Sequence, residues 1–334
     1  MEPRPRQRSS PFDTACPVAR SGPQGDRRFR FRWLEVATTP ESSDPLVGAL
    51  LQRCRFPAGR ALDVAVSGGA DSVALLALAV ASGADVTAHH VDHGTRPGGT
   101  AEAERVRGLC AHWGATFCAH AVEVDAGPNL EARWREARRG VLPPGCLTGH
   151  TADDQAETLV LRLLRGTGPH GLAAMSPDTH PILDLRRSET ESLCEHLGVG
   201  VFHDPTNDSP EFARNRVRRE VLPLLSDISG RDVVPLLVRT AQLAARQREL
   251  LAELADGVDP TDCAALRELP RELAVEVIRG WWISRTGGLP PPDRDGLERM
   301  MAVVNGTTRS CQVTAGWTLA RTAGSLRLEP PQQG

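Results

Sequence analysis

The sequence predicts an α/β protein with a doubly wound, mainly parallel sheet, a helical linker and a small α+β C-terminal domain. Short apolar runs alternate with helical patterns from about residue 44, which is typical of repeated βα units. A glycine-rich turn joins the first apolar run to an alanine- and leucine-rich helix. From about residue 233, long helical patterns precede a short β pattern punctuated by glycines. A chain of 334 residues has room for one medium and one small domain.

The expected elements follow in order along the chain. The first part should hold strands at 61–66, 85–91, 116–124 and 146–148, and helices at 73–82, 100–114, 130–140 and 152–165. The second part should hold helices at 236–255 and 270–284 and a β-meander at 308–328. Parallel strands with right-handed crossovers place ligands at the carboxyl ends of the strands. The motifs with chemical potential all fall at such ends.

The loop between the first strand and the first helix has the pattern Ser-Gly-Gly-X-Asp-Ser. Its backbone amides and the positive end of the helix make an anion site, and the glycines let the chain approach phosphate oxygens. The residues expected to bind the anion are Ser67, Gly68, Gly69, Ala70, Asp71 and Ser72. Two glycines alone would also fit a tight turn with a serine cap, but the full pattern is far more specific.

Asp71 is the unusual member of this loop, because a carboxylate repels a polyphosphate unless a divalent cation lies between them. We therefore expect Asp71 to bind Mg²⁺. The chain contains no lysine, which excludes a Walker-type phosphate loop, since that loop needs a lysine. The pattern resembles the PP-loop of the Rossmann-like ATP pyrophosphatases, which cleave ATP between the α and β phosphates. That resemblance implies ATP as co-substrate and an adenylated intermediate.

The second strand ends in a histidine-rich segment. His89, His90 and His93 lie within five residues, together with Asp92. This composition allows a metal site, but strand geometry places His89 and His90 on opposite faces, and no second ligand cluster has suitable spacing. We favour a loop at the strand end in which His90 and His93 surround a nucleotide.

A third motif, GHTADDQAET at 149–158, opens a helix. Thr151 and Asp154 fit a capping box, which explains both residues without any function. Asp154 and Glu157, however, share a helical face that points at the strand ends. Two carboxylates there can hold a cationic amine, ligate magnesium or take up a proton from a nucleophile.

Arginines form the last group of candidates. Arg214 and Arg218 share one helical face, as do Asn215 and Arg219. They form either a solvated basic face or a contact surface for phosphate and RNA, which the planar guanidinium suits. Arg133, in the first turn of an earlier predicted helix, has no local structural explanation.

Composition limits the other interpretations. The net charge of −3 gives no overall sign of a nucleic-acid binder, although residues 4–32 carry eight arginines among prolines and should be disordered. This extension is either a tail that attracts RNA or the product of a start assigned too far upstream. The sequence contains no run of eighteen apolar residues, so we expect no membrane span. The eight cysteines form no C-x-x-C pair, so we expect reduced thiols in a cytoplasmic protein.

Taken in order, five blocks resemble the tRNA(Ile)-lysidine synthetases: SGGADS, HHVDHGTR, NLEAR, GHTADDQAETLVLRLLRGTG and RNRVRREVLP. The family joins free lysine to C2 of the wobble cytidine, position 34, of the CAU-anticodon isoleucine tRNA, which changes the codon read from AUG to AUA. The cytidine C2 oxygen attacks the α phosphate of ATP, pyrophosphate leaves, and lysine then displaces AMP. The resemblance implies an ATP-dependent carbon–nitrogen ligase with tRNA(Ile) and free lysine as partners, and it is compatible with a homodimer.

The resemblance also assigns roles. The catalytic candidates are Asp71, Asp154, Glu157 and Arg214. The candidates for contact with the tRNA are Arg133, Asn215 and Arg218. Asp154 and Glu157 would bind the ε-ammonium of lysine and help it lose a proton, since an ammonium has no lone pair for attack. The implied domains are a disordered extension (1–45), a PP-loop catalytic domain (46–230), and a helical linker with a small tRNA-binding domain (231–334).

Three positions depart from the family pattern. Thr95 stands where a leucine is common, Thr151 stands where a second histidine is usual, and His180 stands where an arginine is common. Other functions remain as alternatives. A PP-loop thiolase that makes 2-thiocytidine would need sulfur-carrying cysteines, typically paired as C-x-x-C. A synthetase for small metabolites would leave the arginine cluster unused, and a non-catalytic RNA-binding protein would not need the intact acidic residues.

Overall fold

The computed structural model describes residues 37–59, 61–92, 99–122, 140–202 and 212–331, together with helical positions 133 and 137. By their contacts these residues divide into two compact units. The first unit holds the chain up to Leu161 and the segment Met175–Val238. The second holds Arg162–Ala174 and the chain from Arg239 onward. The described chain begins before the expected boundary at residue 45, and the backbone amide of Thr38 donates to the carbonyl of Leu197 at 2.8 Å.

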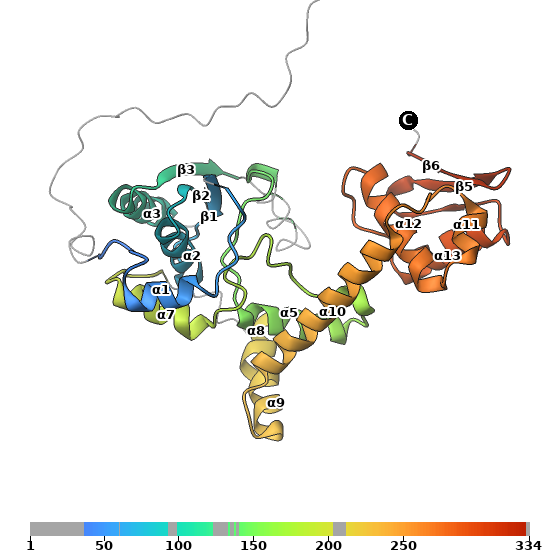
Figure 1. Ribbon diagram of the computed structural model, residues 1–334. Helices are drawn as coiled ribbons and strands as arrows, with labels where there is room; N and C mark the ends of the chain where they lie inside the picture. Colours follow the sequence, from blue (N-terminus) through green and yellow to red (C-terminus); the bar gives the residue numbers. More distant parts are fainter. Residues whose placement is uncertain are drawn as a thin grey trace, which may run out of the picture. The chain divides into compact units, whose positions relative to one another are not determined.

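Three parallel strands form the sheet of the first unit (Figure 1). They are β1 (Ala61–Ala65), β2 (Asp85–Asp92) and β3 (Thr116–Ala121), hydrogen-bonded in the order β1-β2-β3. The parallel α/β fold predicted from the sequence is confirmed. The strand expected at 146–148 is reduced to a single parallel bridge between Leu147 and Val64.

That bridge fixes the functional end of the sheet. Leu147 lies on the opposite side of β1 from β2, because the amide of Ala65 donates to the carbonyl of Leu147 and the amide of Leu147 donates to Asp63, both at 2.8 Å. Both edges of β1 are therefore paired, one with β2 and the other with the segment at Leu147, as at the switch point of a doubly wound sheet. Ligands bind at the carboxyl ends of strands at such a point.

The helices of the first unit are, in chain order, α1 (Pro45–Leu51), α2 (Ala70–Ala81), α3 (Gly99–Trp113), α5 (Ala152–Leu164, up to Leu161 in this unit), α7 (Arg187–His196), α8 (Ala213–Arg216) and α9 (Leu222–Ser229). The long helix α10 (Val234–Ala255) begins in this unit and belongs to the second unit from Arg239 onward. α2 is apolar on all sides and buried through most of its length, which is the behaviour expected of a helix inside a core. Its neighbours include α1, α7, β1 and β2. Because the first turn of α2 carries the SGGADS loop, the core itself holds that loop rigidly.

A five-residue π-helix, Val217–Val221, joins α8 to α9. Pro223 follows directly, in the first turn of α9. Proline lacks an amide hydrogen and clashes with the carbonyl four residues earlier, so a wider turn ahead of it relieves the α-helical hydrogen-bond pattern. Single π turns of this kind are frequent at functional sites. Here the π turn carries Arg218 toward the acidic residues of α5.

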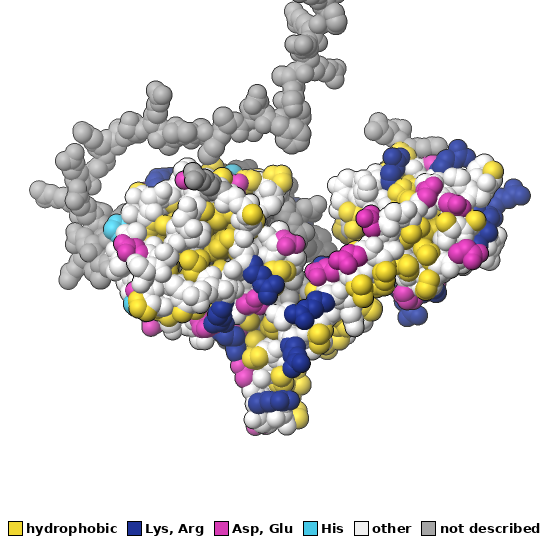
Figure 2. Space-filling view, viewed as in Figure 1, with side chains coloured by type: hydrophobic (Ala, Val, Ile, Leu, Met, Phe, Trp, Pro, Cys, Tyr) yellow, Lys and Arg dark blue, Asp and Glu magenta, His cyan; other side chains and the backbone are white. Residues whose placement is uncertain are grey.

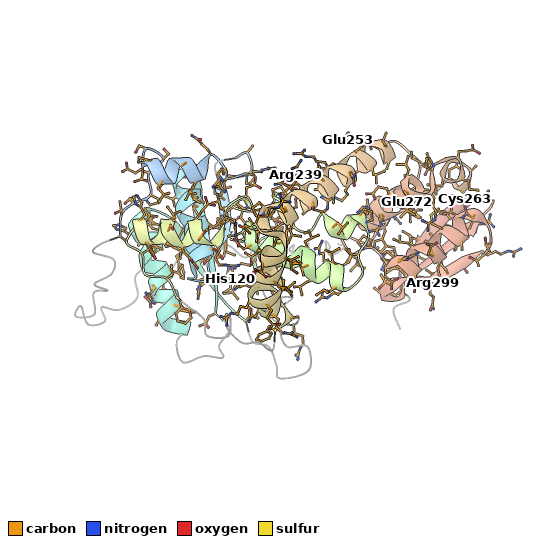
Figure 3. The ribbon with its side chains drawn as sticks, turned by 90° about the horizontal axis from the view of Figure 1, so that it is seen from below. His120, Arg239, Glu253, Cys263, Glu272 and Arg299 are labelled. Carbon is orange, nitrogen blue, oxygen red and sulfur yellow. The ribbon has the colours of Figure 1, made fainter. Side chains whose placement is uncertain are left out.

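The second unit is a small α+β assembly. Its elements are α6 (Pro169–Leu172), α11 (Cys263–Glu268), α12 (Arg271–Arg285), α13 (Arg294–Asn305), β4 (Ser310–Gln312), β5 (Thr318–Thr322) and β6 (Ser325–Glu329). The strands form an antiparallel sheet in chain order, as the sequence predicts. Trp282, fully buried, packs with Ile278, Met300 and Leu319. Figure 3 marks Cys263 at the start of α11 and Glu272 at the start of α12.

Gly149 is placed where only glycine fits. It follows the Leu147 bridge and lies against the first turn of α2, so a Cβ at this position would lie 2.6 Å from the backbone oxygen of Asp71. This is far inside van der Waals contact, and the obstructing atom belongs to backbone that cannot rotate away. The glycine lets the GHTADD segment approach the SGGADS loop.

We predict that Gly149→Ala lowers the free energy of unfolding by about 1–3 kcal/mol, because the added methyl group must displace the first turn of α2. Urea denaturation followed by circular dichroism measures the loss. Gly140→Ala is the matched control, since Gly140 is exposed and a Cβ added there would meet nothing within 4 Å. Equal stability of the two variants would contradict the close packing.

Candidate active site

The SGGADS loop is held in shape by one hydroxyl group. Ser72 Oγ accepts hydrogen bonds from the backbone amides of Ser67 and Gly68, each at 3.2 Å, and donates to the carbonyl of Gly69 at 2.9 Å. Gly68 has φ = +92°, in the left-handed region that favours glycine. The loop therefore has a fixed, wound backbone that leads into the N-terminus of α2, as an anion site requires.

Asp71 projects from the first turn of α2. Its Oδ1 accepts a short hydrogen bond from Thr190 Oγ1, and its Oδ2 lies 3.4 Å from Arg187 Nε. Burial raises the pKa of Asp71 to about 6, with a smaller contribution from the negative charge of Asp154. The charged carboxylate is therefore poorly compensated in this structure, and a cation would relieve it.

Asp154 and Glu157 lie side by side on α5, both buried. Asp154 Oδ2 accepts from the amide of Thr151 at 2.9 Å and from its hydroxyl at 3.0 Å, which confirms local capping by this pair. Burial raises the pKa of Asp154, but Arg187 and Arg214 outweigh that effect and hold it below its ordinary value. Glu157 is fully buried, and each of its carboxylate oxygens forms an ion pair with an arginine. The cap and the arginines therefore contact different oxygens of Asp154, Oδ2 and Oδ1 respectively.

Three arginines converge on these carboxylates. Arg187 donates to Asp154 at 2.9 Å and Glu157 at 3.3 Å. Arg214 donates to Asp154 at 2.9 Å and to Glu157 at 2.7 Å. Arg218 donates to Glu157 at 2.6 and 3.2 Å. Together with Asp71, the site holds three carboxylates and three guanidinium groups.

Arg187 is a member of this cluster that the sequence alone did not reveal. It begins α7, a helix that was not predicted, and Asp153 fixes that start: its Oδ2 accepts from the backbone amide of Arg187 at 2.8 Å. Asp153 also binds the guanidinium of Arg186 with two hydrogen bonds of 3.0 Å. The two neighbouring aspartates therefore have different contacts: Asp153 binds the start of α7, and Asp154 binds the side chain of Arg187. The available signal was the RR dipeptide at 186–187, which no local motif explains.

A histidine pair adjoins the acidic pair. Thr148 Oγ1 lies 2.9 Å from His150 Nδ1 and 2.6 Å from His180 Nδ1, and the two rings meet edge to face with centroids 4.6 Å apart. Burial lowers the pKa of His180 to about 4, helped by His150. His180 is therefore neutral at pH 7, so the position where the family commonly has arginine contributes no charge here.

The remaining sequence candidates are placed as follows. His90 is buried, and its Nδ1 lies 2.8 Å from the carbonyl of Val66, directly before the loop. Asn215 is buried on α8, and Arg133 is half-buried. His93 lies outside the described residues. Contact of these side chains with nucleotide or tRNA stays a prediction.

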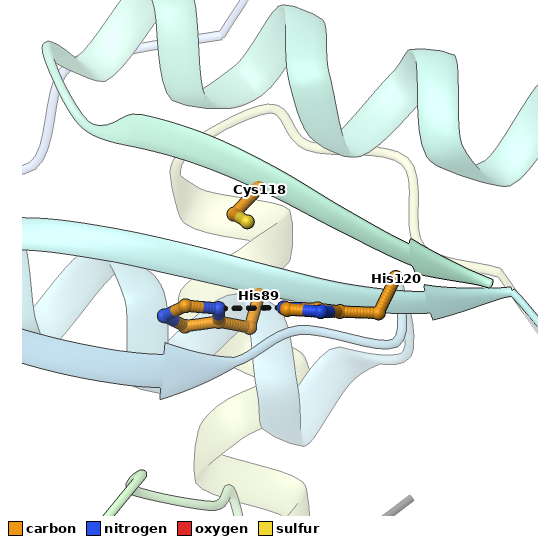
Figure 4. Close-up of side chains that lie close together, drawn as sticks. All are labelled: His89, Cys118 and His120. Carbon is orange, nitrogen blue, oxygen red and sulfur yellow. Dashed lines mark hydrogen bonds between the residues drawn. The ribbon is translucent and has the colours of Figure 1, made fainter. Parts of the chain in front are cut away.

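The histidine-rich strand end differs from expectation in one respect. The sequence showed no second ligand cluster near His89, yet the fold brings Cys118 and His120 of β3 beside it, with ligand atoms within 4.8 Å of one another (Figure 4). The partners come from a neighbouring strand, so no spacing along the sequence reveals them.

Comparison with known proteins places the chain in a family. A model of the PP-loop domain matches residues 46–225, and a model of the TilS substrate binding domain matches residues 262–327. A tRNA(Ile)-lysidine synthase from Rhodococcus erythropolis is 38% identical over 259 residues, covering 71% of this chain and 80% of that protein. The chain belongs to the tRNA(Ile)-lysidine synthase family. The synthases from Nocardia farcinica (40% over 258 residues; 71% and 80% covered) and Rhodococcus jostii (42% over 245; 66% and 73%) agree.

The family match and the geometry fall on the same residues. The PP-loop match contains the SGGADS loop, the acidic pair and all three arginines. The TilS substrate binding match lies within the second unit, over α11, α12, α13 and the antiparallel sheet. Among solved structures, a U34-tRNA thiolase from Methanococcus maripaludis is similar at 16% identity with a TM-score of 0.49, covering 60% of this chain and 78% of that one. None of the helices in the described ranges has the length and apolar character needed to cross a bilayer.

Asp71 should cost stability at neutral pH. Its folded pKa of about 6 exceeds the ordinary value of 3.8, so ionisation is disfavoured in the folded state, and stability falls as the pH rises through 6. We predict that Asp71→Asn raises the free energy of unfolding by about 1–3 kcal/mol at pH 8 and has little effect near pH 4. Urea denaturation at both pH values measures this. Asp85→Asn, at an exposed position, is the control, and a destabilised Asp71→Asn at pH 8 would refute the raised pKa.

Proposed function

We propose that this protein forms lysidine: it uses ATP to join lysine to C2 of cytidine 34 in the CAU-anticodon tRNA(Ile), releasing AMP and pyrophosphate. The observation that carries this proposal is the meeting of the SGGADS loop with a buried acidic pair, bridged by Arg187, in a chain of the tRNA(Ile)-lysidine synthase family. The loop supplies a phosphate site, and the acidic pair supplies an amine site beside it.

The chain's own groups account for ATP binding and orientation. The backbone of the loop and the positive end of α2 favour a polyphosphate. The guanidinium groups of Arg187, Arg214 and Arg218 bind the carboxylates of this site, and their planar geometry suits phosphate oxygens as well. A phosphate arriving at the loop therefore meets donors already oriented by the acidic residues.

The residues present also fit magnesium. Asp71 offers a carboxylate oxygen, which Mg²⁺ prefers, in a half-buried position where desolvation and, to a smaller extent, the negative charge of Asp154 raise its pKa. We propose that Asp71 holds the ion. Bound there, magnesium would neutralise phosphate charge, which is its usual contribution to phosphoryl and nucleotidyl transfer.

Lysine binding requires an exchange of cations at the acidic pair. The charges of Asp154 and Glu157 are already balanced by arginines, so an incoming ε-ammonium must replace one of these arginines. At Glu157, Arg187 makes the longest of the three arginine contacts, 3.3 Å, whereas Arg214 and Arg218 approach within 2.7 Å. Its contact with Asp154, at 2.9 Å, equals that of Arg214. We propose that Arg187 turns toward the ATP phosphates and leaves Asp154 and Glu157 to bind the amine and accept its proton.

The α8–α9 segment is the proposed tRNA-facing surface of the first unit. Figure 2 shows arginine side chains around it, with apolar side chains between them. Arg216 and Arg219 are exposed there, and so are Leu224 and Ile228. Guanidinium groups suit phosphate contacts, which position a nucleic acid without reading its sequence. The proposal also includes a cytoplasmic location and a homodimeric assembly.

The direct test supplies purified protein with ATP, Mg²⁺, labelled lysine and a CAU-anticodon tRNA(Ile) transcript. Label should enter the tRNA, with one AMP and one pyrophosphate per lysine. Asp71→Asn should stop both pyrophosphate release and labelling, whereas Asp85→Asn should retain them. Pyrophosphate release that depends on sulfide instead of lysine would overturn the proposal in favour of a thiolase.

Glu157→Gln separates the two half-reactions. The amide keeps the shape of the side chain but loses the charge that attracts an ammonium, so the KM for lysine should rise about 10–100-fold, as expected for a lost charge-assisted contact. Formation of adenylated tRNA without lysine should persist. Glu195→Gln, at an exposed position on α7, should match the wild type. A lysine KM equal to that of the wild type would refute the amine-binding role.

A further inference from the structure

One face of the parallel sheet is unexpectedly polar. Buried strands of a parallel sheet are normally apolar on both faces. In β1 and β2 one face carries Leu62, Val64, Val86 and Ala88, all buried in the main core. Side chains alternate along a strand, so the opposite face of the same strands carries Asp63 and His89.

The register of the strands gathers further donors on this face. His89 of β2 pairs with Cys118 of β3 in parallel register, and His120 lies two residues further along β3, so all three side chains point the same way. His89 and Cys118 are 5% and 7% exposed, and His120 is half-buried. Figure 4 shows the two imidazoles edge on to each other with the thiol above them, and Figure 3 marks His120 within the first unit.

Asp63 orients this group. Its Oδ1 lies 2.7 Å from His89 Nε2, while His89 Nδ1 lies 2.9 Å from His120 Nε2. When Nε2 of His89 carries the proton and donates it to Asp63, Nδ1 presents a lone pair toward His120. A carboxylate that holds the far nitrogen of a histidine is the usual outer partner of a metal-bound imidazole.

We propose that His89, Cys118 and His120 form a binding site for a zinc-like divalent cation, with Asp63 as the outer partner of His89. Two imidazoles and a thiolate are the donors zinc prefers, and their ligand atoms all lie within 4.8 Å of one another. Tetrahedral zinc with bonds of about 2.0–2.3 Å separates its ligands by about 3.3–3.8 Å. The 2.9 Å between the histidine nitrogens must therefore open by roughly half an ångström.

Binding is balanced as a proton exchange. The proton that His120 Nε2 donates to His89 Nδ1 first moves to Nδ1 of His120, so that both facing nitrogens offer lone pairs. The cation then takes the lone pairs of His89 Nδ1, His120 Nε2 and the Cys118 sulfur, the thiol releases one proton to solvent, and water fills the fourth position. The metal would link β2 to β3 near their carboxyl ends, the end of the sheet at which the SGGADS loop follows β1. A hydrogen-bonded Asp63–His89–His120 chain without metal is the competing explanation, and it does not involve the thiol beside the imidazoles.

The test uses the full chain with zinc and, separately, cobalt as a spectroscopic probe. Elemental analysis after gel filtration should find about one zinc per chain. Cobalt should give the visible absorption of a tetrahedral ion and a near-ultraviolet charge-transfer band from a cobalt–thiolate bond. Cys118→Ser should lose that band, and His120→Gln should lose tetrahedral binding. Cys54→Ser and His196→Gln, which change a thiol and an imidazole elsewhere in the unit, should retain both signals.

Asp63→Asn gives an independent readout, since it touches no ligand atom and should weaken zinc binding roughly 10–100-fold through the orientation of His89. Far-ultraviolet circular dichroism establishes that each variant is folded. If Cys118→Ser does not fold, the charge-transfer band of the wild type and the Asp63→Asn affinity still decide. Zinc well below one per chain, an absent cobalt–thiolate band, or equal metal content in wild type and folded ligand variants overturns the proposal.

Discussion

The site depends on the pairing of two buried carboxylates and one half-buried carboxylate with three guanidinium groups. Asp154 and Glu157, on α5, could not stay charged in a buried position without partners, because an unpaired buried charge costs several kcal/mol, and Asp71, on α2, is half-buried beside them. The partners arrive from α7 and from the α8–π segment. This requirement fixes how four separate helices must be oriented around the end of the sheet.

The same pairing explains how the site can be stable and still reactive. Arginines that balance carboxylates in one state can balance phosphates in another, so a polyphosphate exchanges partners within an existing network. Asp71 is the member with the weakest compensation, because Arg187 reaches it only at 3.4 Å and burial raises its pKa. Poor compensation at one carboxylate leaves a place for a cation, at a cost to stability that a purely structural ion pair would not carry.

Local sequence patterns predicted much of the fold and of the candidate site. The order of the strands, the SGGADS loop and the capping of Thr151 by the side chain of Asp154 are short-range features, and the structure contains each of them. α7 and α13 were not predicted; α7 in particular is short and strongly charged, and its buried face of Thr190, Leu193 and Cys194 contains only one large aliphatic side chain. The helix expected at 130–140 lies largely outside the described residues.

By itself the sequence determined the chemistry available: a glycine-rich loop with an aspartate, two carboxylates three residues apart and a run of arginines, because these depend on neighbours along the chain. Only the tertiary structure decided how they are used. Arg187 meets Asp71 across 116 residues, and Cys118 and His120 meet His89 across a strand pair. Such contacts depend on sheet register and helix docking, which arise from the burial of the whole core and leave no local pattern to read.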